Sequence, residues 1–148
     1  MTEIGFYHLT RTGAEEALAP LLGRTLQNGF RALVRCRDAA RVDAVDAALW
    51  RMPEPVWLPH GTARTGDPAL QPVWITDDAD VPNAATYLFL LDGTQAPDAA
   101  RFERIFDLFD GNDAAGVDEA RLRWMQAKAA GHALAYWKQE PKGWIRAR

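Results

Sequence analysis

The sequence predicts a three-layer, doubly wound α/β domain built on a largely parallel sheet. Short apolar segments alternate with helical patterns along the chain, which favours right-handed crossover connections. Residues 86–92 are almost continuously apolar, as expected for a central parallel strand covered on both faces. No repeat, linker or low-complexity segment divides the 148 residues, so we expect one domain spanning 1–148.

In the N-terminal half, residues 4–9 and 30–36 are the predicted strands, each followed by a helix. Thr12 and Glu15 have the spacing of a capping box at the start of the first helix. That helix is expected to end at Gly29, where glycine suits a left-handed cap.

Asp38 is expected to cap the second helix, which runs from Ala39 to about Trp50. Its buried face is predicted from spacings of three and four residues: Val42, Val45 and Leu49. Trp50 lies roughly 100° further round the helix, on the polar side, so we expect it to be partly exposed. Pro53 and Pro55 then end the helix.

The C-terminal half is expected to add a loop at 62–72, a short helix from Pro97 and a long helix from about Asp113 to Ala130, closed by Gly131. Its predicted strands span residues 73–76, 86–92, 105–109 and 133–138. On the long helix, we assign Leu122 and Ala129 to the core. The last residues, at about 140–148, are predicted to be a short basic tail that contains Trp144.

Composition narrows the classes of function. The net charge is −3, which argues against strong direct nucleic-acid binding as the main activity, because such binding needs clustered Lys and Arg. The chain has a single cysteine, Cys36, no apolar run of membrane-spanning length and no signal pattern. We therefore expect a cytoplasmic protein without a metal or other cofactor.

Catalytic motifs are not evident in the sequence. The first predicted strand-to-helix turn, residues 9–13, lacks the glycines of a phosphate-binding loop. The three histidines have no metal-binding spacing, and the acidic cluster at 77–80 reads equally well as a solvated loop. The alternative to a binding protein is a small α/β enzyme that uses Cys36 or a strand-end Asp as a catalytic residue. For Cys36, a structural role as a small, buried apolar side chain is favoured.

Two surfaces are candidates for protein binding. Arg121, Trp124 and Lys128 share one face of the long helix, which either forms a solvated edge or combines an aromatic wall with two cations. The stretch from Trp50 to Pro59 contains a second tryptophan, Trp57, and reads either as a core flap or as an interaction patch.

Short motifs along nearly the whole chain resemble the chi subunit family of bacterial DNA polymerase III holoenzyme. These are the segments 6–9 (FYHL), 46–50 (DAALW), 57–61 (WLPHG) and the helix at 121–131. The resemblance implies a non-enzymatic adaptor that binds the acidic C-terminal tail of single-stranded-DNA-binding protein and joins it to the clamp loader through the psi subunit or an equivalent.

The resemblance also implies which residues bind. The positions for the tail of single-stranded-DNA-binding protein would be Arg121, Trp124, Met125 and Lys128. The positions for psi or another clamp-loader component would be Trp50, Trp57, Leu58 and Pro59. Met125 departs from the family pattern, which has a basic residue there, so Arg123 or Lys128 would supply the charge.

Overall fold

The computed structural model describes residues 2–53 and 58–148. Along the chain its elements are β1 (Glu3–Leu9), α1 (Ala14–Gln27), β2 (Ala32–Arg35), α2 (Ala39–Arg51), the 3₁₀ turn η1 (Pro68–Leu70), β3 (Val73–Thr76), β4 (Tyr87–Leu90), the 3₁₀ turn η2 (Ala99–Arg101), β5 (Arg104–Asp110), α3 (Ala114–Ala129), β6 (Ala133–Glu140) and β7 (Gly143–Arg146). The described part of the chain contains no helix that is both long enough and apolar enough to cross a membrane.

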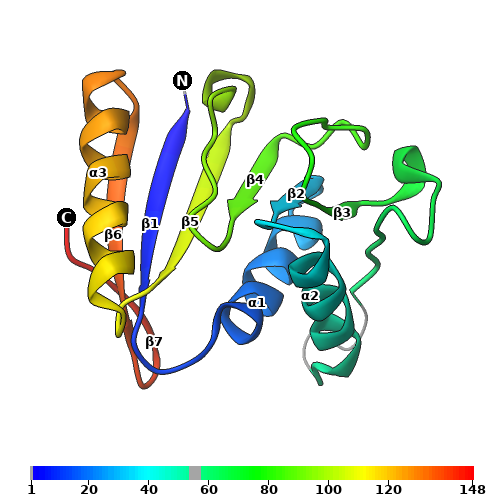
Figure 1. Ribbon diagram of the computed structural model, residues 1–148, viewed down its shortest axis with the longest axis horizontal. Helices are drawn as coiled ribbons and strands as arrows, with labels where there is room; N and C mark the ends of the chain where they lie inside the picture. The colour runs from blue at the N-terminus through cyan, green and yellow to red at the C-terminus, as the bar shows by residue number, and fades with distance from the viewer. Residues whose placement is uncertain (1, 54–57) are drawn as a thin grey trace.

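The strands form one seven-stranded sheet in the order β3-β2-β4-β5-β1-β6-β7 (Figure 1). All neighbouring pairs are parallel except β6 and β7, which form an antiparallel pair at one edge. β4 lies between β2 and β5 and all four of its residues are buried, so the central position predicted for residues 86–92 is confirmed. The predicted largely parallel α/β fold is confirmed with it.

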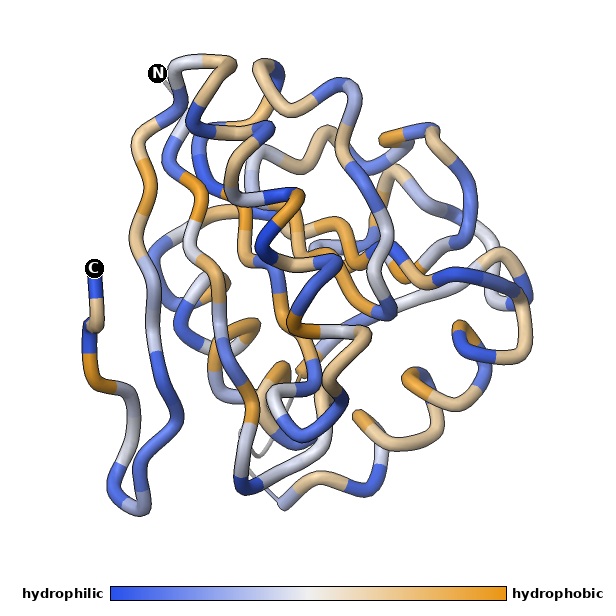
Figure 2. The backbone as a smooth tube through the Cα atoms, turned by 60° about the vertical axis from the view of Figure 1, so that its left-hand side comes forward, coloured by the Kyte–Doolittle hydropathy of each residue, from blue (hydrophilic) through white to orange (hydrophobic). Residues whose placement is uncertain are grey.

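Helices cover both faces of the sheet, which gives the predicted three layers. α1 and α2 pack on one face, around a core that contains Leu18, Leu22 and Val45. α3 packs on the opposite face over Phe6 and Ile105, and the segment around η2 completes this second core. Apolar segments accordingly concentrate in the middle strands, whereas the C-terminal hairpin stands at the rim (Figure 2).

The start of α1 differs from the prediction. Its N-cap is Gly13, without a side-chain cap, so the capping box of Thr12 and Glu15 does not form. Instead the Thr12 hydroxyl accepts a 2.7 Å hydrogen bond from the side chain of Gln139 on β6, and Glu15 binds Arg41 of α2. Hydrogen bonds to residues distant in sequence therefore replace the expected local contacts of Thr12 and Glu15. The Asp38 cap of α2 does form, with its carboxylate accepting from the N–H of Arg41 at 2.9 Å.

The buried face of α3 also differs. Leu122 is 58% exposed and Ala129 is exposed, so their assignment to the core is wrong. The face against the sheet is instead made by one large side chain and several small ones: Val117, Ala120, Trp124 and Ala127. Small residues let α3 approach the aromatic side chains that rise from β1 and β6, and this close packing outweighs the greater hydrophobicity of leucine.

The predicted basic tail is a strand. β6 continues to Glu140, and β7 pairs back along it from Gly143, whose φ of +130° suits the turn. Trp144 packs edge-on against Tyr7, with ring centroids 5.0 Å apart. Packing of this half-buried indole against the core explains why a segment with a basic composition is ordered against the sheet.

Candidate functional site

The carboxyl ends of β1 and β5 form the switch point of the sheet, where open α/β domains commonly bind ligands. α1 leaves β1 toward one face and α3 leaves β5 toward the other, and a polar crevice of about 670 Å³ lies between the two loops. The crevice is lined by the acidic residues Glu15, Asp92, Asp110, Asp113 and Glu119 as well as by four arginines.

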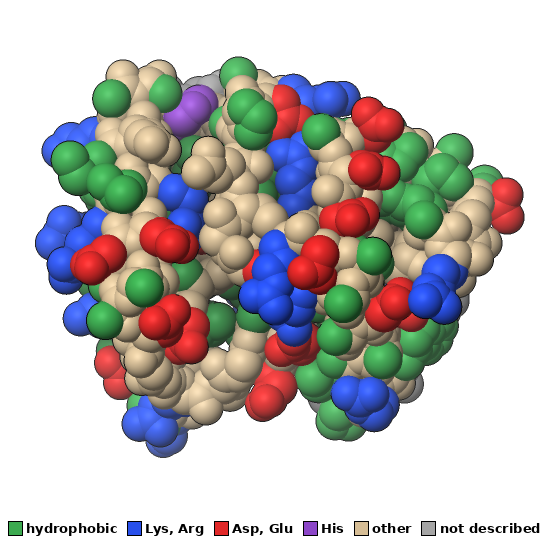
Figure 3. Space-filling model, in the orientation of Figure 1, with side chains coloured by type: hydrophobic (Ala, Val, Ile, Leu, Met, Phe, Trp, Pro, Cys, Tyr) green, Lys and Arg blue, Asp and Glu red, His purple; other side chains and the backbone are tan. Residues whose placement is uncertain are grey.

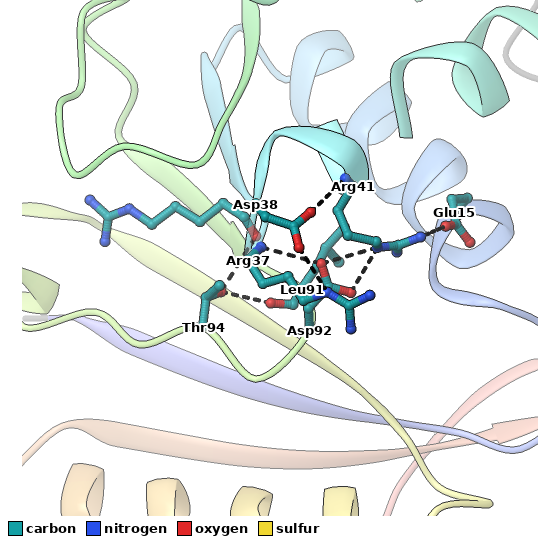
Figure 4. A network of polar contacts seen from close by, with 8 residues as sticks. Glu15, Arg37, Asp38, Arg41, Leu91, Asp92 and Thr94 are labelled. Carbon is teal, nitrogen blue, oxygen red and sulfur yellow. Dashed lines mark hydrogen bonds and ion pairs between the residues drawn. The ribbon is translucent and has the colours of Figure 1, made fainter. Parts of the chain in front are cut away.

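Internal ion pairs occupy the polar groups on one side of this crevice (Figure 4). Arg41 contacts Glu15 at 2.7 Å and Asp92 at 3.1 Å, which ties α2 to the first turn of α1 and to the loop after β4. Burial alone would raise the pKa of Glu15, but its backbone hydrogen bond and the Arg41 guanidinium lower it. A phosphate group would have to compete with these carboxylates for Arg41, so the crevice disfavours a polyphosphate ligand.

A different hollow combines aromatic surface with free cations. The α3–β6 pocket, as we call it, has a volume of about 400 Å³ and lies between the N-terminal half of α3 and the adjoining strands. Its principal side chains are His8, Phe109, Arg121, Trp124, Tyr136 and Lys138. Figure 3 shows the face of the molecule on which α3 lies, where acidic and basic side chains are intermixed.

The floor of the α3–β6 pocket is held rigidly by aromatic contacts. The Trp124 ring lies edge-on to Phe6 of β1 at 5.3 Å and to Tyr136 of β6 at 5.9 Å between centroids. The hydroxyl of Tyr136 lies 2.5 Å from Nδ1 of His8. Burial, and then the nearby Lys138 charge, lower the pKa of His8, so its imidazole is neutral at pH 7 and contributes aromatic surface rather than charge.

Three exposed cations line the α3–β6 pocket: Arg121, Lys138 and Arg148. The Arg121 side chain is 75% exposed and makes only a 3.7 Å contact with Asp118, which is equally exposed. Lys138, on β6, is exposed as well. Exposed pairs of this kind contribute little stability, so Arg121 can be redirected to a ligand at low cost. The pocket therefore suits an apolar side chain attached to an anionic group.

Sequence reasoning located only part of this pocket. Arg121 and Trp124 line it, but Lys128 does not, and Met125 is 63% exposed on the outer side of α3. His8, on β1, is half-buried and forms part of the wall. Tyr136 and Lys138 were missed, although their alternation along the last predicted strand places both side chains on one face.

The second predicted surface is only partly described, because Trp57 lies outside the described residues. Trp50 is 62% exposed, as expected, and its ring contacts that of His60 at a tilt of 43°, with centroids 4.6 Å apart. The His60 ring is held between the Leu58 carbonyl oxygen, 2.7 Å from Nδ1, and an Asp46 carboxylate oxygen, 3.1 Å from Nε2. Leu58 is buried in the α1–α2 core, so Trp50 and the half-buried Pro59 provide the accessible surface.

Cys36 is unsuited to nucleophilic catalysis. Its side chain is buried, and burial together with the Asp92 charge raises the pKa of the thiol to about 12. The thiolate that such chemistry requires is therefore scarce at neutral pH. The acidic cluster is a solvated turn, with Asp77, Asp78 and Asp80 all exposed after β3.

Comparison with known proteins gives one consistent result. The model of the family described as DNA polymerase III chi subunit, HolC, matches residues 1–135. The chain is also similar to a probable DNA polymerase III subunit chi from Rickettsia prowazekii (strain Madrid E), with 26% identity over 94 residues. That alignment covers 64% of this chain and 57% of the relative, so the chain spans little more than half the length of the curated relative.

Proposed function

This chain belongs to the DNA polymerase III chi subunit family, and we propose that its part in replication is to bind the acidic C-terminal tail of single-stranded-DNA-binding protein in the α3–β6 pocket. Membership of the family supports a replication accessory role. The identity of the ligand rests on the chemistry of the pocket and on the known partners of the family.

The observation that carries the proposal is the combination of an aromatic floor with cations at the rim. A peptide that ends in an apolar residue can place its last side chain against Trp124 and Tyr136 and its terminal carboxylate beside Arg121. Acidic residues upstream in the peptide then meet Lys138, and Lys128 lies about two turns beyond Arg121 along α3. The neutral His8 ring adds surface without repelling the cations or attracting the carboxylate.

Substitution of Arg121 tests this arrangement. A charge-assisted contact contributes about 1.5–3 kcal/mol, so Arg121→Ala should weaken binding of an acidic peptide ending in Phe by roughly 10- to 150-fold. The thermal midpoint should change little, because Arg121 is exposed. Arg64→Ala is the matched control, since the Arg64 side chain is 79% exposed and lies outside the pocket. Equal losses in both variants would indicate a general charge effect and would contradict the assignment.

We also propose that the surface around Trp50 connects the protein to the clamp loader, through psi or an equivalent component. An exposed tryptophan held in place by a buried histidine is suited to act as a rigid interface anchor, because little side-chain entropy is lost on binding. The two surfaces are formed by different elements, the end of α2 and the face between α3 and β6, so both partners could bind at once.

The proposed role involves binding rather than catalysis. The buried Cys36 thiol, with its pKa raised to about 12, supports this view, because the most nucleophilic side chain in the described part of the chain is held in its unreactive form. Arg41, at the switch point, is likewise committed to Glu15 and Asp92.

A further inference from the structure

A second aromatic hollow lies on the opposite face of the sheet from the α3–β6 pocket. It has a volume of about 250 Å³ and lies between the C-terminal half of α1 and side chains of β1, β4, β5, β6 and β7. Five aromatic side chains line it: Tyr7, Tyr87, Phe106, Trp137 and Trp144. We call this hollow the aromatic trough.

The trough is built by side chains that neighbouring strands place on one face. Tyr7 is paired with Trp137, and their rings stack with centroids 6.2 Å apart and an interplanar angle of 11°. A Cβ on Gly5 would lie 2.8 Å from Cε1 of Tyr7, so glycine is what lets the Tyr7 ring lie flat over β1. Trp137 and Trp144 remain half-buried, which leaves part of each indole accessible from the trough.

Two arginines border this aromatic surface. The guanidinium of Arg104 lies 4.7 Å from the Phe106 ring centroid, and its nearest described carboxylate, on Glu3, is 3.9 Å away. Arg24, on α1, is exposed at the rim. Burial raises the pKa of the Tyr7 hydroxyl even though both arginine charges oppose that shift, so Tyr7 stays neutral and the trough has a local positive charge.

We propose that the aromatic trough binds one base of single-stranded nucleic acid, with a flanking phosphate held by Arg24 and Arg104. Its apolar surface is almost entirely aromatic, which suits stacking of a base more than insertion of an aliphatic side chain. The Asn28 amide at the rim can both donate to and accept from a base edge. The volume is below the range of about 300–1,000 Å³ typical of drug-sized ligands, so it accommodates one base rather than several.

This inference does not depend on the tail-binding function. Stacking of a single base and one or two phosphate contacts give weak binding, which agrees with the net charge of −3. We expect an isolated oligonucleotide to bind with a dissociation constant above about 0.1 mM at physiological salt, the weak end of the non-specific range. The contact would be useful only where a partner already holds the DNA nearby.

Residue-resolved NMR of the full chain tests the proposal through its indole N–H signals. A thymidine tetranucleotide, titrated at low salt, should shift the Trp137 and Trp144 signals saturably and leave those of Trp50 and Trp124 in place. An abasic tetranucleotide of equal charge should shift them far less, because it offers phosphates without a base. Equal shifts from both oligonucleotides, or no shift at millimolar concentration, would overturn the proposal.

Variants and a competing ligand complete the test. Arg24→Glu should weaken tetranucleotide binding by about 10-fold or more with the rest of the spectrum unchanged, whereas the remote Arg64→Glu should not. Trp144→Ala should weaken tetranucleotide binding by roughly 5- to 150-fold, and Trp144→Phe should recover part of the loss.

An acidic peptide ending in Phe should shift the indole signal of Trp124 and not that of Trp144. A peptide that shifts Trp144 and displaces the tetranucleotide would show that the trough is a peptide site instead.

Discussion

Replacement of Arg123 by Leu should destabilise the domain severely, because Arg123 neutralises a carboxylate inside the core between α3 and the sheet. Asp107 lies in the middle of β5, and its side chain is 3% exposed. The guanidinium of Arg123 on α3 donates two hydrogen bonds to this carboxylate, from Nε to Oδ2 at 2.7 Å and from Nη2 to Oδ1 at 3.0 Å. Burial raises the pKa of Asp107, and only Arg123 opposes that shift.

The magnitude follows from the cost of leaving one buried charge unpaired. Breaking a buried ion pair by removing one partner costs about 3–5 kcal/mol, whereas replacing both partners by apolar residues can be nearly neutral. For a chain of 148 residues, each kcal/mol lowers the thermal midpoint by roughly 3 °C, so Arg123→Leu should lower it by roughly 9–15 °C. Asp107→Leu combined with Arg123→Leu should recover most of that loss.

Urea unfolding followed by circular dichroism measures the free energy of unfolding of the wild type, both single variants and the double variant. The expected result is a double variant more stable than Arg123→Leu alone. Arg121→Leu, two residues away on the exposed side of α3, is the control for helix propensity. A loss of less than about 1 kcal/mol in Arg123→Leu would refute the reasoning, because it would mean that Asp107 is solvated or neutral without its partner.

Two further predictions concern other parts of the molecule. Trp50→Ala should leave the thermal midpoint and tail-peptide binding unchanged but abolish co-purification with a clamp-loader component; unfolding of the variant would favour a structural role for the indole. The Arg35 hydrogen bonds lower the pKa of Asp98 below its ordinary value of 3.8, against the opposing effect of burial. The unfolded chain therefore binds the proton first, so this stabilisation is present at neutral pH and is lost as the pH falls below about 4. In an acid titration monitored by circular dichroism, the folded fraction of Asp98→Asn should fall less steeply with decreasing pH than that of the wild type. Parallel falls in the two proteins would contradict this.

Regular patterns made six of the strands and all three α-helices in the described part of the chain predictable, whereas β7 was missed. The apolar run at β4, the Asp38 cap and the stripe of Val42, Val45 and Leu49 each depend on neighbours in sequence, and all three were located correctly. The misassigned elements depend on distant partners. Thr12 bonds to Gln139 across more than a hundred residues, and no local pattern contains that information.

The candidate site was predictable to the same limited extent. Helical spacing grouped Arg121, Trp124 and Lys128 on one face. The first two line the α3–β6 pocket and Lys128 does not, because spacing alone does not show which side of the helix faces the sheet. The structure resolves this, since Trp124 contacts Phe6 and Tyr136 while Met125 points outward. His8 and Lys138 enter the pocket only because β1 and β6 are neighbours in the sheet, which the order of elements along the chain does not reveal.

The most direct test of the proposed function compares two forms of one peptide. An acidic peptide ending in Phe is titrated into the wild-type protein as the free acid and as the C-terminal amide, with fluorescence anisotropy of a label at the peptide N-terminus as the signal. If Arg121 captures the terminal carboxylate, the amide should bind roughly 10- to 150-fold more weakly, and the free acid should lose that advantage in Arg121→Ala. Equal binding of the acid and the amide to the wild-type protein would contradict capture of a chain end by the α3–β6 pocket.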